Sequence, residues 1–178
     1  MKKHVALLRG INVGGNKKVS MQELKKIFGE CGFSEVSTYI NSGNVLFSTD
    51  DDEKQLPQKI ENILEKSFGF SIKVLVRSAK NIKNLVEKIP AEWKNDADMK
   101  TDVLFLCDEF DKEQTIDMLH IHKDVDTVMY SDGAIVWHIL RKNYAQSAMH
   151  AFIGSTVYKN MTARNVNTVR KLAHMLTS

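Results

Sequence analysis

A glycine-rich, basic segment near the start of the sequence combines the residue types that bind anions. It reads Arg9-Gly10-Ile11-Asn12-Val13-Gly14-Gly15-Asn16-Lys17-Lys18 and follows an apolar run over residues 5–8. Backbone amides of adjacent glycines can face a phosphate or a carboxylate, and arginine or lysine supplies the countercharge. The segment therefore predicts an anion-binding loop. Its candidate ligands are Arg9, Asn12, Gly14, Gly15 and Lys17, with Lys18 as a further cation. A Gly-Gly turn with solvated lysines is the alternative.

The same segment does not match a nucleotide-binding P-loop. Gly10 and Gly15 have the four-residue gap of that motif. However, Asn16 stands where the motif needs lysine, and Lys17 stands where Ser or Thr would hold Mg²⁺. A capping box over residues 20–23 is expected to occupy the first amides of the following helix. An anion at this place would then depend on the loop amides.

A polar turn forms the second candidate segment. Residues 36–40 and 45–48 resemble the two strands of a hairpin, joined by Asn41-Ser42-Gly43-Asn44. In a split βαβ unit this hairpin ends on the same side of the sheet as the first strand. We therefore expect the turn beside the first segment, where three of its side chains would recognise a phosphate or carboxylate: Asn41, Ser42 and Asn44. Turn chemistry that needs no ligand is the alternative.

The third candidate segment lies near the end of the sequence. A helix is predicted over residues 163–176, with Thr162 as its cap and Arg164, Thr168 and Lys171 on one face. No glutamate follows three residues after the cap, so the first amides could accept an anion. The candidate ligands here are Arg164, Asn165 and Thr168. A solvated basic helix face is the alternative. We expect the three segments to converge on one site.

The spacing of apolar residues predicts an α+β fold. The order β-α-β-β-α-β over about residues 4–77 is that of the ferredoxin-like split βαβ unit. In this topology the first and third strands are central, and these are the two with continuous apolar runs, whereas the fourth, at an edge, alternates. A helix at 79–89 and an acidic connector then lead to a second, degenerate β-α-β-β unit. Its expected elements are a strand at 102–107, a helix at 111–120, strands at 125–130 and 134–140, and C-terminal helices near 144–153 and 163–176. The predicted subdomains are 1–78 and 79–178, packed as one compact body.

Composition and charge limit the class of protein. Hydrophobic residues make up 43% of the chain and charged residues 26%, as in globular proteins. Residues 133–178 carry six basic side chains and no acidic one, whereas residues 90–132 carry four basic and twelve acidic ones. The basic tail should attract phosphate, nucleotide or nucleic acid, unless it packs against the acidic segment.

Other features argue for a cytoplasmic protein. Cys31 and Cys107 form no C-x-x-C motif and are typical of thiols in a reducing compartment. No apolar run approaches the roughly twenty residues that span a bilayer, and no signal-peptide core is present, so no membrane partner is expected. His120 and His122 lack further ligands at zinc spacing, so neither a metal nor a cofactor is expected. The sequence leaves the oligomeric state open.

Three segments resemble the signatures of a bacterial family, domain of unknown function 1697. They are residues 7–15, residues 38–45 and residues 162–168, and their order and spacing match over essentially the whole chain. The resemblance implies a bacterial α+β protein of ferredoxin-like subdomains with no assigned activity, substrate or catalytic residue. Val166 departs from the tryptophan that the family often has at this position, so a stacking role is not expected there.

Three functional hypotheses follow. The leading one is a protein that binds a phosphate-bearing ligand, a nucleotide or a nucleic-acid backbone, at the basic glycine-rich site. The second is a hydrolase of a small phosphorylated or acylated substrate, in which Arg9 and the asparagines stabilise developing negative charge. It requires a nucleophile or general base that spacing does not identify. The third is a structural or protein-interaction module whose motifs determine the fold.

Overall fold

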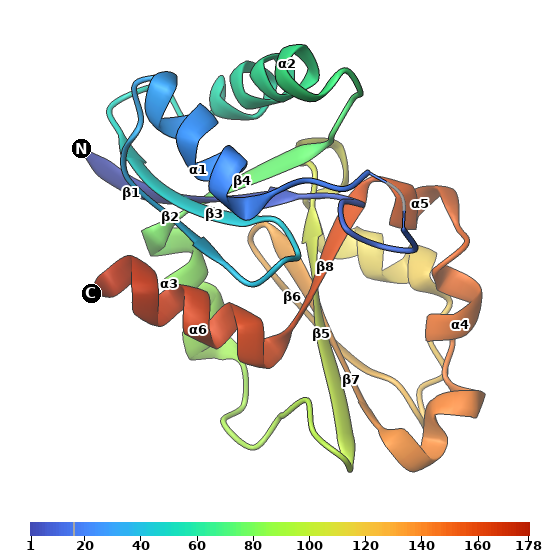
Figure 1. Cartoon of the computed structure of the whole chain (residues 1–178). Helices are drawn as coiled ribbons and strands as arrows, with labels where there is room; N and C mark the ends of the chain where they lie inside the picture. The colour runs from blue at the N-terminus through green and yellow to red at the C-terminus, as the bar shows by residue number, and fades with distance from the viewer. Residues whose placement is uncertain (16) are drawn as a thin grey trace. The chain divides into compact units, whose positions relative to one another are not determined.

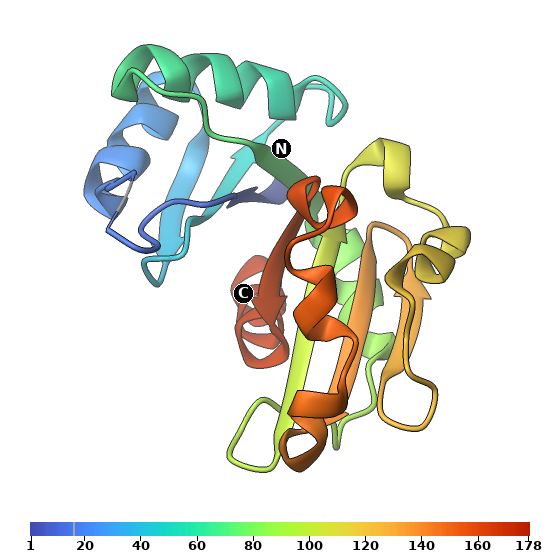
Figure 2. The same cartoon turned by 90° about the vertical axis from the view of Figure 1, so that its right-hand side faces the viewer.

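The chain forms two compact units, each built on one antiparallel sheet. The computed structural model describes residues 1–15 and 17–178. The first unit comprises residues 1–80 and 175–178, and the second comprises residues 81–174. Each contains one four-stranded sheet, and Figures 1 and 2 show the sheets and helices from two sides. The predicted α+β class is confirmed.

The first unit has the element order that the sequence predicts. Its elements are β1 (Lys2–Leu8), α1 (Met21–Glu30), β2 (Ser34–Tyr39), β3 (Asn44–Thr49), α2 (Leu56–Phe68) and β4 (Val74–Ser78). The strands lie in the order β2-β3-β1-β4, all antiparallel. As expected, the first and third strands are central, and every residue of β3 is buried. The loop after β1 and the β2–β3 turn therefore leave the sheet at one end.

Two amphipathic helices cover one face of this sheet. In α1 the buried stripe is Leu24, Ile27 and Phe28, and Ser20 caps the helix by accepting a hydrogen bond from Glu23 N at 3.4 Å. The buried stripe of α2 is Leu56, Ile60 and Leu64, which recur every four residues. Both stripes join one hydrophobic core with Phe47 of β3. Figure 1 shows the two helices together on the same side of the strands.

The second unit repeats the strand order of the first. After α3 (Ala79–Lys88) come β5 (Met99–Leu106), β6 (Thr127–Ser131), β7 (Ala134–Leu140), β8 (Met161–Asn165) and α6 (Val166–Thr177). The sheet order is β6-β7-β5-β8. In both units a corresponding backbone hydrogen bond joins the end of the first strand to the hairpin turn: Leu8 N donates to Gly43 O at 2.8 Å, and Leu106 N donates to Gly133 O at 2.9 Å.

Two helix predictions in this half are wrong. Residues 161–165 form strand β8, because they pair with β5, and α6 begins only at Val166. Thr162 therefore does not cap the helix, and Asn165 Oδ1 accepts from Thr168 N at 2.9 Å instead. The segment predicted as a helix at 111–120 is a 3₁₀ helix, Glu113–Leu119. The Thr115 hydroxyl closes this turn locally by donating to Phe110 O at 2.7 Å.

The predicted helix at 144–153 is also wrong as one element. It divides into a 3₁₀ helix, Arg141–Gln146, and a short helix α4, Met149–Phe152, which is followed by α5 (Thr156–Lys159). The break has a physical cause. The carboxylate of Asp126 accepts hydrogen bonds from Ser147 Oγ at 2.5 Å and from Ala148 N at 3.1 Å, between the two pieces.

Asp126 is a buried anion that joins three parts of the second unit. It is 4% exposed and also accepts from Trp137 Nε1 of β7 and His122 N, both at 2.9 Å. Burial by itself raises the pKa of the Asp126 carboxyl. The hydrogen bonds from Ser147, the two backbone amides and Trp137 outweigh burial and hold the pKa below its ordinary value. The carboxylate is therefore the form that the folded unit needs.

No helix among residues 1–15 and 17–178 combines the length and apolar character needed to cross a bilayer.

We expect Asp126→Asn to lower the free energy of unfolding by about 3 kcal/mol, because the amide group turns a donor toward groups that themselves donate. Urea unfolding followed by tryptophan fluorescence measures this loss. Because the pKa of Asp126 is depressed, its contribution is present above the ordinary aspartate range and is lost as the pH falls through the folded-state pKa. Asp124→Asn, on an exposed neighbour, is the control and should change stability little. Equal losses of unfolding free energy in the two variants would contradict a stabilising role of the Asp126 carboxylate.

Candidate functional site

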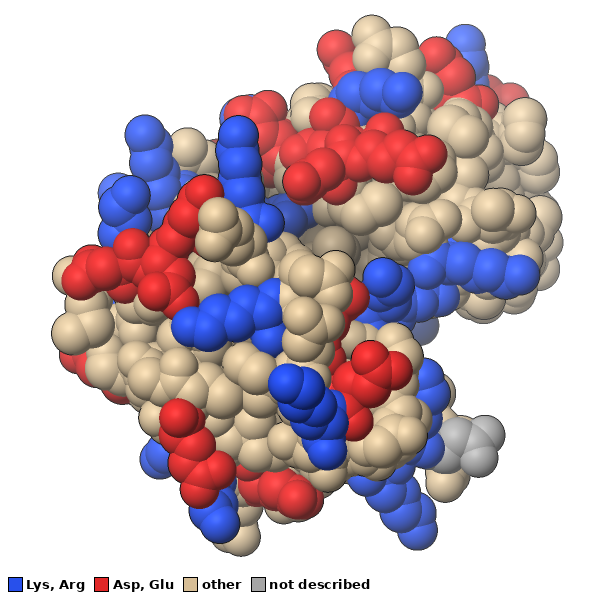
Figure 3. All heavy atoms as spheres, turned by 90° about the horizontal axis from the view of Figure 1, so that it is seen from above, with Lys and Arg blue, Asp and Glu red and all other residues tan. Residues whose placement is uncertain are grey.

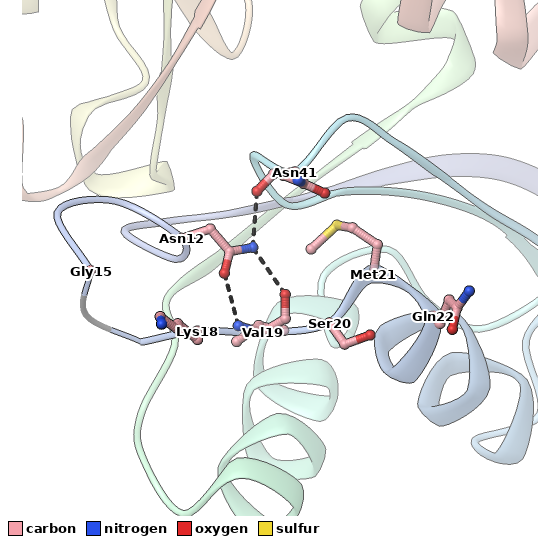
Figure 4. Close-up of a pocket in the computed structure, with 8 residues that line it drawn as sticks. All are labelled: Asn12, Gly15, Lys18, Val19, Ser20, Met21, Gln22 and Asn41. Atoms are coloured by element: carbon pink, nitrogen blue, oxygen red, sulfur yellow. Dashed lines mark hydrogen bonds between the residues drawn. The ribbon is translucent and has the colours of Figure 1, made fainter.

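The loop between β1 and α1, residues 9–19, is closed by the side chain of Asn12. Asn12 Nδ2 donates to Val19 O at 2.9 Å and to Asn41 O at 3.0 Å, and Asn12 Oδ1 accepts from Val19 N at 2.8 Å (Figure 4). One carboxamide thus joins both ends of the loop and the hairpin turn between β2 and β3. Both N–H groups of Asn12 are used within the chain, so its role here is structural.

The hairpin turn lies directly against the β1–α1 loop at Gly43. Its φ is +76°, and a Cβ placed there would lie 2.8 Å from both Leu8 Cβ and Ile11 Cδ1. Only glycine fits this conformation and this distance. The expectation that the first strand and this turn end at the same place is confirmed by this contact and by the Asn12–Asn41 hydrogen bond.

Asn44 and Ser42 hold the turn itself. Asn44 is fully buried, and its Nδ2 donates to Tyr39 O at 3.0 Å and to Ser42 Oγ at 2.9 Å. These bonds are the turn chemistry that the sequence left open as an alternative to ligand binding. The Asn41 side chain, in contrast, belongs to an exposed residue that lines a hollow beside the turn.

The backbone of the β1–α1 loop takes left-handed conformations repeatedly. Gly14 and Gly15 have φ of +63° and +78°, and Asn12 has φ of +55°. A Cβ on either glycine would meet nothing within 4 Å, so glycine serves the backbone conformation and not a close packing contact. Asn16, part of the predicted segment, lies outside the described residues.

The basic residues of the loop have different surroundings. Lys17 Nζ donates to Ser71 O at 2.9 Å and lies 5.5 Å from the centre of the Phe70 ring. Arg9 is half-buried, interacts with other residues, and donates its backbone N–H to Lys73 O at 2.8 Å. The exposed Lys18 makes no hydrogen bond or ion pair with a described residue and lines the hollow. Lys18, not Lys17, is therefore the lysine that the hollow offers to a ligand.

An open hollow of about 550 Å³ lies between the loop, the hairpin turn and the start of α1 (Figure 4). Its described lining residues are Asn12, Gly15, Lys18, Val19, Ser20, Met21, Gln22 and Asn41. Lys18 carries the one charge in this set, and none of these residues has a carboxylate. Figure 3 shows both basic and acidic side chains on the face of the molecule that it draws. The described lining of the hollow therefore carries one positive charge and no negative charge.

The first turn of α1 adds hydrogen-bond donors to the hollow. Ser20 Oγ caps Glu23 N, whereas the amides of Met21 and Gln22 make no hydrogen bond to a described residue. The first amides of a helix have no partner within the helix, and one serine oxygen caps one of them here. The expectation that the capping box occupies these amides is therefore wrong for Met21 and Gln22. In the sequence, Ser20 as the predicted cap already marked the two residues, Met21 and Gln22, whose amides have no partner within the helix.

The third predicted segment belongs to the second unit and has a different geometry. Arg164 is in β8, so it does not share a helix face with Lys171, and that prediction is wrong. Arg164 is 9% exposed, its Nη1 donates to Ala163 O at 2.8 Å, and burial lowers its pKa to about 10. Asn165 caps α6, and Thr168 is buried. That these residues share a site with the first unit stays a prediction.

The lining of the hollow supports binding better than hydrolysis. Hydrolysis needs a nucleophile or a general base. None of the described lining residues is Asp, Glu, His, Cys or Tyr, and the Ser20 hydroxyl is engaged as a helix cap. Ammonium groups and the first amides of helices are groups with which proteins hold anions.

Two comparisons with known proteins find relatives of this chain. The family model described as "Protein of unknown function (DUF1697)" matches residues 1–137, which include the β1–α1 loop and the hairpin turn. A solved structure of a conserved bacterial protein, SP0830 from Streptococcus pneumoniae, is similar over 98% of both chains, with a TM-score of 0.86 and 30% sequence identity. No curated protein matches the chain.

We expect Asn12→Asp to destabilise the first unit by about 2 kcal/mol. The substitution keeps the shape and tolerates the left-handed backbone, but it replaces two N–H donors with an oxygen that faces two carbonyls. Thermal or urea unfolding measures the loss. Asn62→Asp, at an exposed position of α2, is the control for adding one negative charge. Equal stability of the two variants would show that the Asn12 hydrogen bonds do not hold the loop.

A methyl group at Gly43 should lower the free energy of unfolding by about 2–3 kcal/mol, since it combines a left-handed backbone with contacts that are too short. Gly29→Ala provides the contrast. Gly29 lies in α1 with ordinary φ and open space around it, so alanine there should leave stability unchanged or raise it. The same urea experiment compares the two variants. A Gly43→Ala protein as stable as Gly29→Ala would contradict the close approach.

Proposed function

The chain belongs to the DUF1697 family of proteins of unknown function, and we propose from its geometry that it binds a phosphate-bearing ligand in the hollow at the start of α1. The observation that carries this proposal is the combination of Lys18, which has no partner among the described residues, with the amides of Met21 and Gln22. Lys18 and the first residues of α1 line the same hollow, and none of its described lining residues has a carboxylate.

Helix electrostatics support an anion at this position. The N-terminal end of an α-helix carries a partial positive charge, and its first N–H groups point along the axis toward a ligand. Helix α1 has ten residues, and its start contributes to the wall of the hollow. The carboxamides of Gln22 and Asn41 add further groups that can donate to phosphate oxygens.

The number of cations favours a small ligand. A nucleic-acid backbone is bound by many lysines and arginines, each of which neutralises one phosphate. Here the hollow has one ammonium, while Lys17 is held by Ser71 and Phe70. Among the predicted ligands, a nucleotide or another small phosphate ester fits this balance better than a polynucleotide.

A structural role of the motifs is the second candidate, and specific contacts favour it for part of the set. The hydrogen bonds of Asn12 and Asn44 and the close approach at Gly43 are all made within the fold. These three residues hold the loop and the turn together. The side chains of Lys18 and Gln22 have no such role in the described contacts, so the two candidate functions make different predictions for them.

We expect Lys18→Gln to weaken binding of a phosphate ester about tenfold, which is ~1.4 kcal/mol, because it removes the ammonium from the hollow. Isothermal titration with inorganic phosphate, adenosine monophosphate and a single-stranded oligonucleotide measures the affinities. Each affinity should fall as the salt concentration is raised. When affinity is expressed per phosphate group, the mononucleotide should bind at least as tightly as the oligonucleotide.

Lys17→Gln is the matched control, since it removes the same charge one position away from a side chain directed to Ser71. It should reduce the affinity much less than Lys18→Gln. Unfolding measurements on both variants check that the loop is intact. If none of the three probes binds or raises the melting temperature, the structural role of the motifs is favoured instead.

A further inference from the structure

Two large apolar side chains of the first unit are exposed beside the hollow. Val13 is 69% exposed and Ile40 is 49% exposed. Val13 directly follows Asn12, and Ile40 directly precedes Asn41. These two asparagines line the hollow and are joined by the hydrogen bond from Asn12 Nδ2 to Asn41 O. Among the described residues of this unit, the remaining large apolar side chain with such exposure is the terminal Met1. The exposed apolar surface of the unit therefore lies at the hollow.

The backbone at Ile40 is unfavourable for the residue that occupies it. Ile40 is the first residue after β2 and has φ of +49°. Among the described residues with positive φ it is the β-branched one, and a β-branched residue is a rare outlier in the left-handed region. Glycine or asparagine adopts this conformation more readily.

Packing within the fold does not explain this choice of residue. The described hydrophobic core of the first unit does not include Ile40, and about half of the Ile40 side chain remains exposed. The isoleucine thus adds strain to the turn and gains little burial in return. Strained residues of this kind cluster at ligand sites. A contact made with a bound molecule would account for an apolar side chain here.

Met21 continues the apolar surface into the hollow. It is the first residue of α1, it is half-buried, and it lines the hollow. Its side chain extends toward the hairpin turn in Figure 4. A thioether is flexible and polarisable, so it adapts to the faces of rings. The hollow therefore combines an apolar part near the turn with the ammonium of Lys18.

A ligand with two unlike parts fits this combination. Small-molecule sites are mostly apolar, with a few polar groups that fix the orientation of the ligand, and they span about 300–1,000 Å³. The hollow of about 550 Å³ lies within this range. A sugar phosphate is polar throughout and gains little from apolar side chains. A nucleotide adds a flat base, whose faces lose contact with water when they pack against such side chains.

We propose that the hollow binds a nucleoside monophosphate, with its base against Val13 and Ile40 and its phosphate at Lys18. This inference rests on the proposed function, since the phosphate and Lys18 define the site. It adds the class of phosphate ester and assigns the specificity for that class to the two exposed apolar residues. Neither residue has a charge or a hydrogen-bonding side chain, so their effect concerns the base and not the phosphate.

Isothermal titration with adenosine monophosphate and ribose 5-phosphate tests the inference, because the two esters share the sugar and the phosphate and differ by the base. The wild type should bind adenosine monophosphate about tenfold more tightly. Ile40→Asn should reduce this preference about fivefold and should leave the affinity for ribose 5-phosphate within about twofold. Since asparagine accepts the left-handed backbone, the same variant should melt no lower than the wild type. Val13→Ser should reduce the preference in the same direction.

Ile153→Asn is the matched control, because it makes the same change at an isoleucine of the second unit that is 47% exposed and does not line the hollow. It should alter neither affinity. Equal affinities of the wild type for the two esters would overturn the inference, as would a preference that both Ile40→Asn and Val13→Ser retain. In either case, weaker binding of ribose 5-phosphate by Lys18→Gln would still support the proposed function. If neither ester binds to the wild type, the proposed function and this inference are both wrong.

Discussion

The carboxamide of Asn12 links three points of backbone that the rest of the first unit depends on. It bonds to both backbone groups of Val19, at the entrance of α1, and to Asn41 O in the hairpin turn. The intervening loop uses left-handed conformations that few residues adopt without support. Each hydrogen bond is worth only about 1 kcal/mol, but the bonds act on a single side chain and so fix the loop, the helix and the turn together.

This constraint explains why the signature residues divide into two groups. The side chains of Asn12 and Asn44 donate hydrogen bonds that hold the loop and the turn, and Gly43 lets the two approach because it has no side chain. What they hold open is the hollow at the start of α1, where Lys18 and two helix amides remain available. Residues that the sequence suggests as ligands thus hold the loop and the turn together, and residues next to them line the hollow.

Local patterns predicted the first unit well because its elements are set by local periodicity. The helical stripes and the hairpin turn follow from spacing, and the meeting of loop and turn follows from topology. The choice between Lys17 and Lys18 could not be predicted, since it depends on Ser71, which is distant in the sequence. Strand β8 was missed for a similar reason. Its 3.6-residue pattern is overridden by pairing with β5, a contact that the local sequence does not contain.

The second unit meets the same constraint with a charged carboxylate in place of a neutral carboxamide. The Leu106–Gly133 hydrogen bond corresponds to the Leu8–Gly43 bond, so the chain leaving β5 again lies beside a hairpin turn. Here Asp111 takes the place of the carboxamide, and its Oδ1 accepts from Gly133 N at 2.7 Å and from Tyr130 OH at 2.9 Å. Burial and this carboxylate raise the pKa of Tyr130 to about 12. A carboxylate at this position repels anions, whereas an amide does not. The two units therefore close the loop beside the hairpin turn in the same way, with a neutral carboxamide in the first unit and a carboxylate in the second.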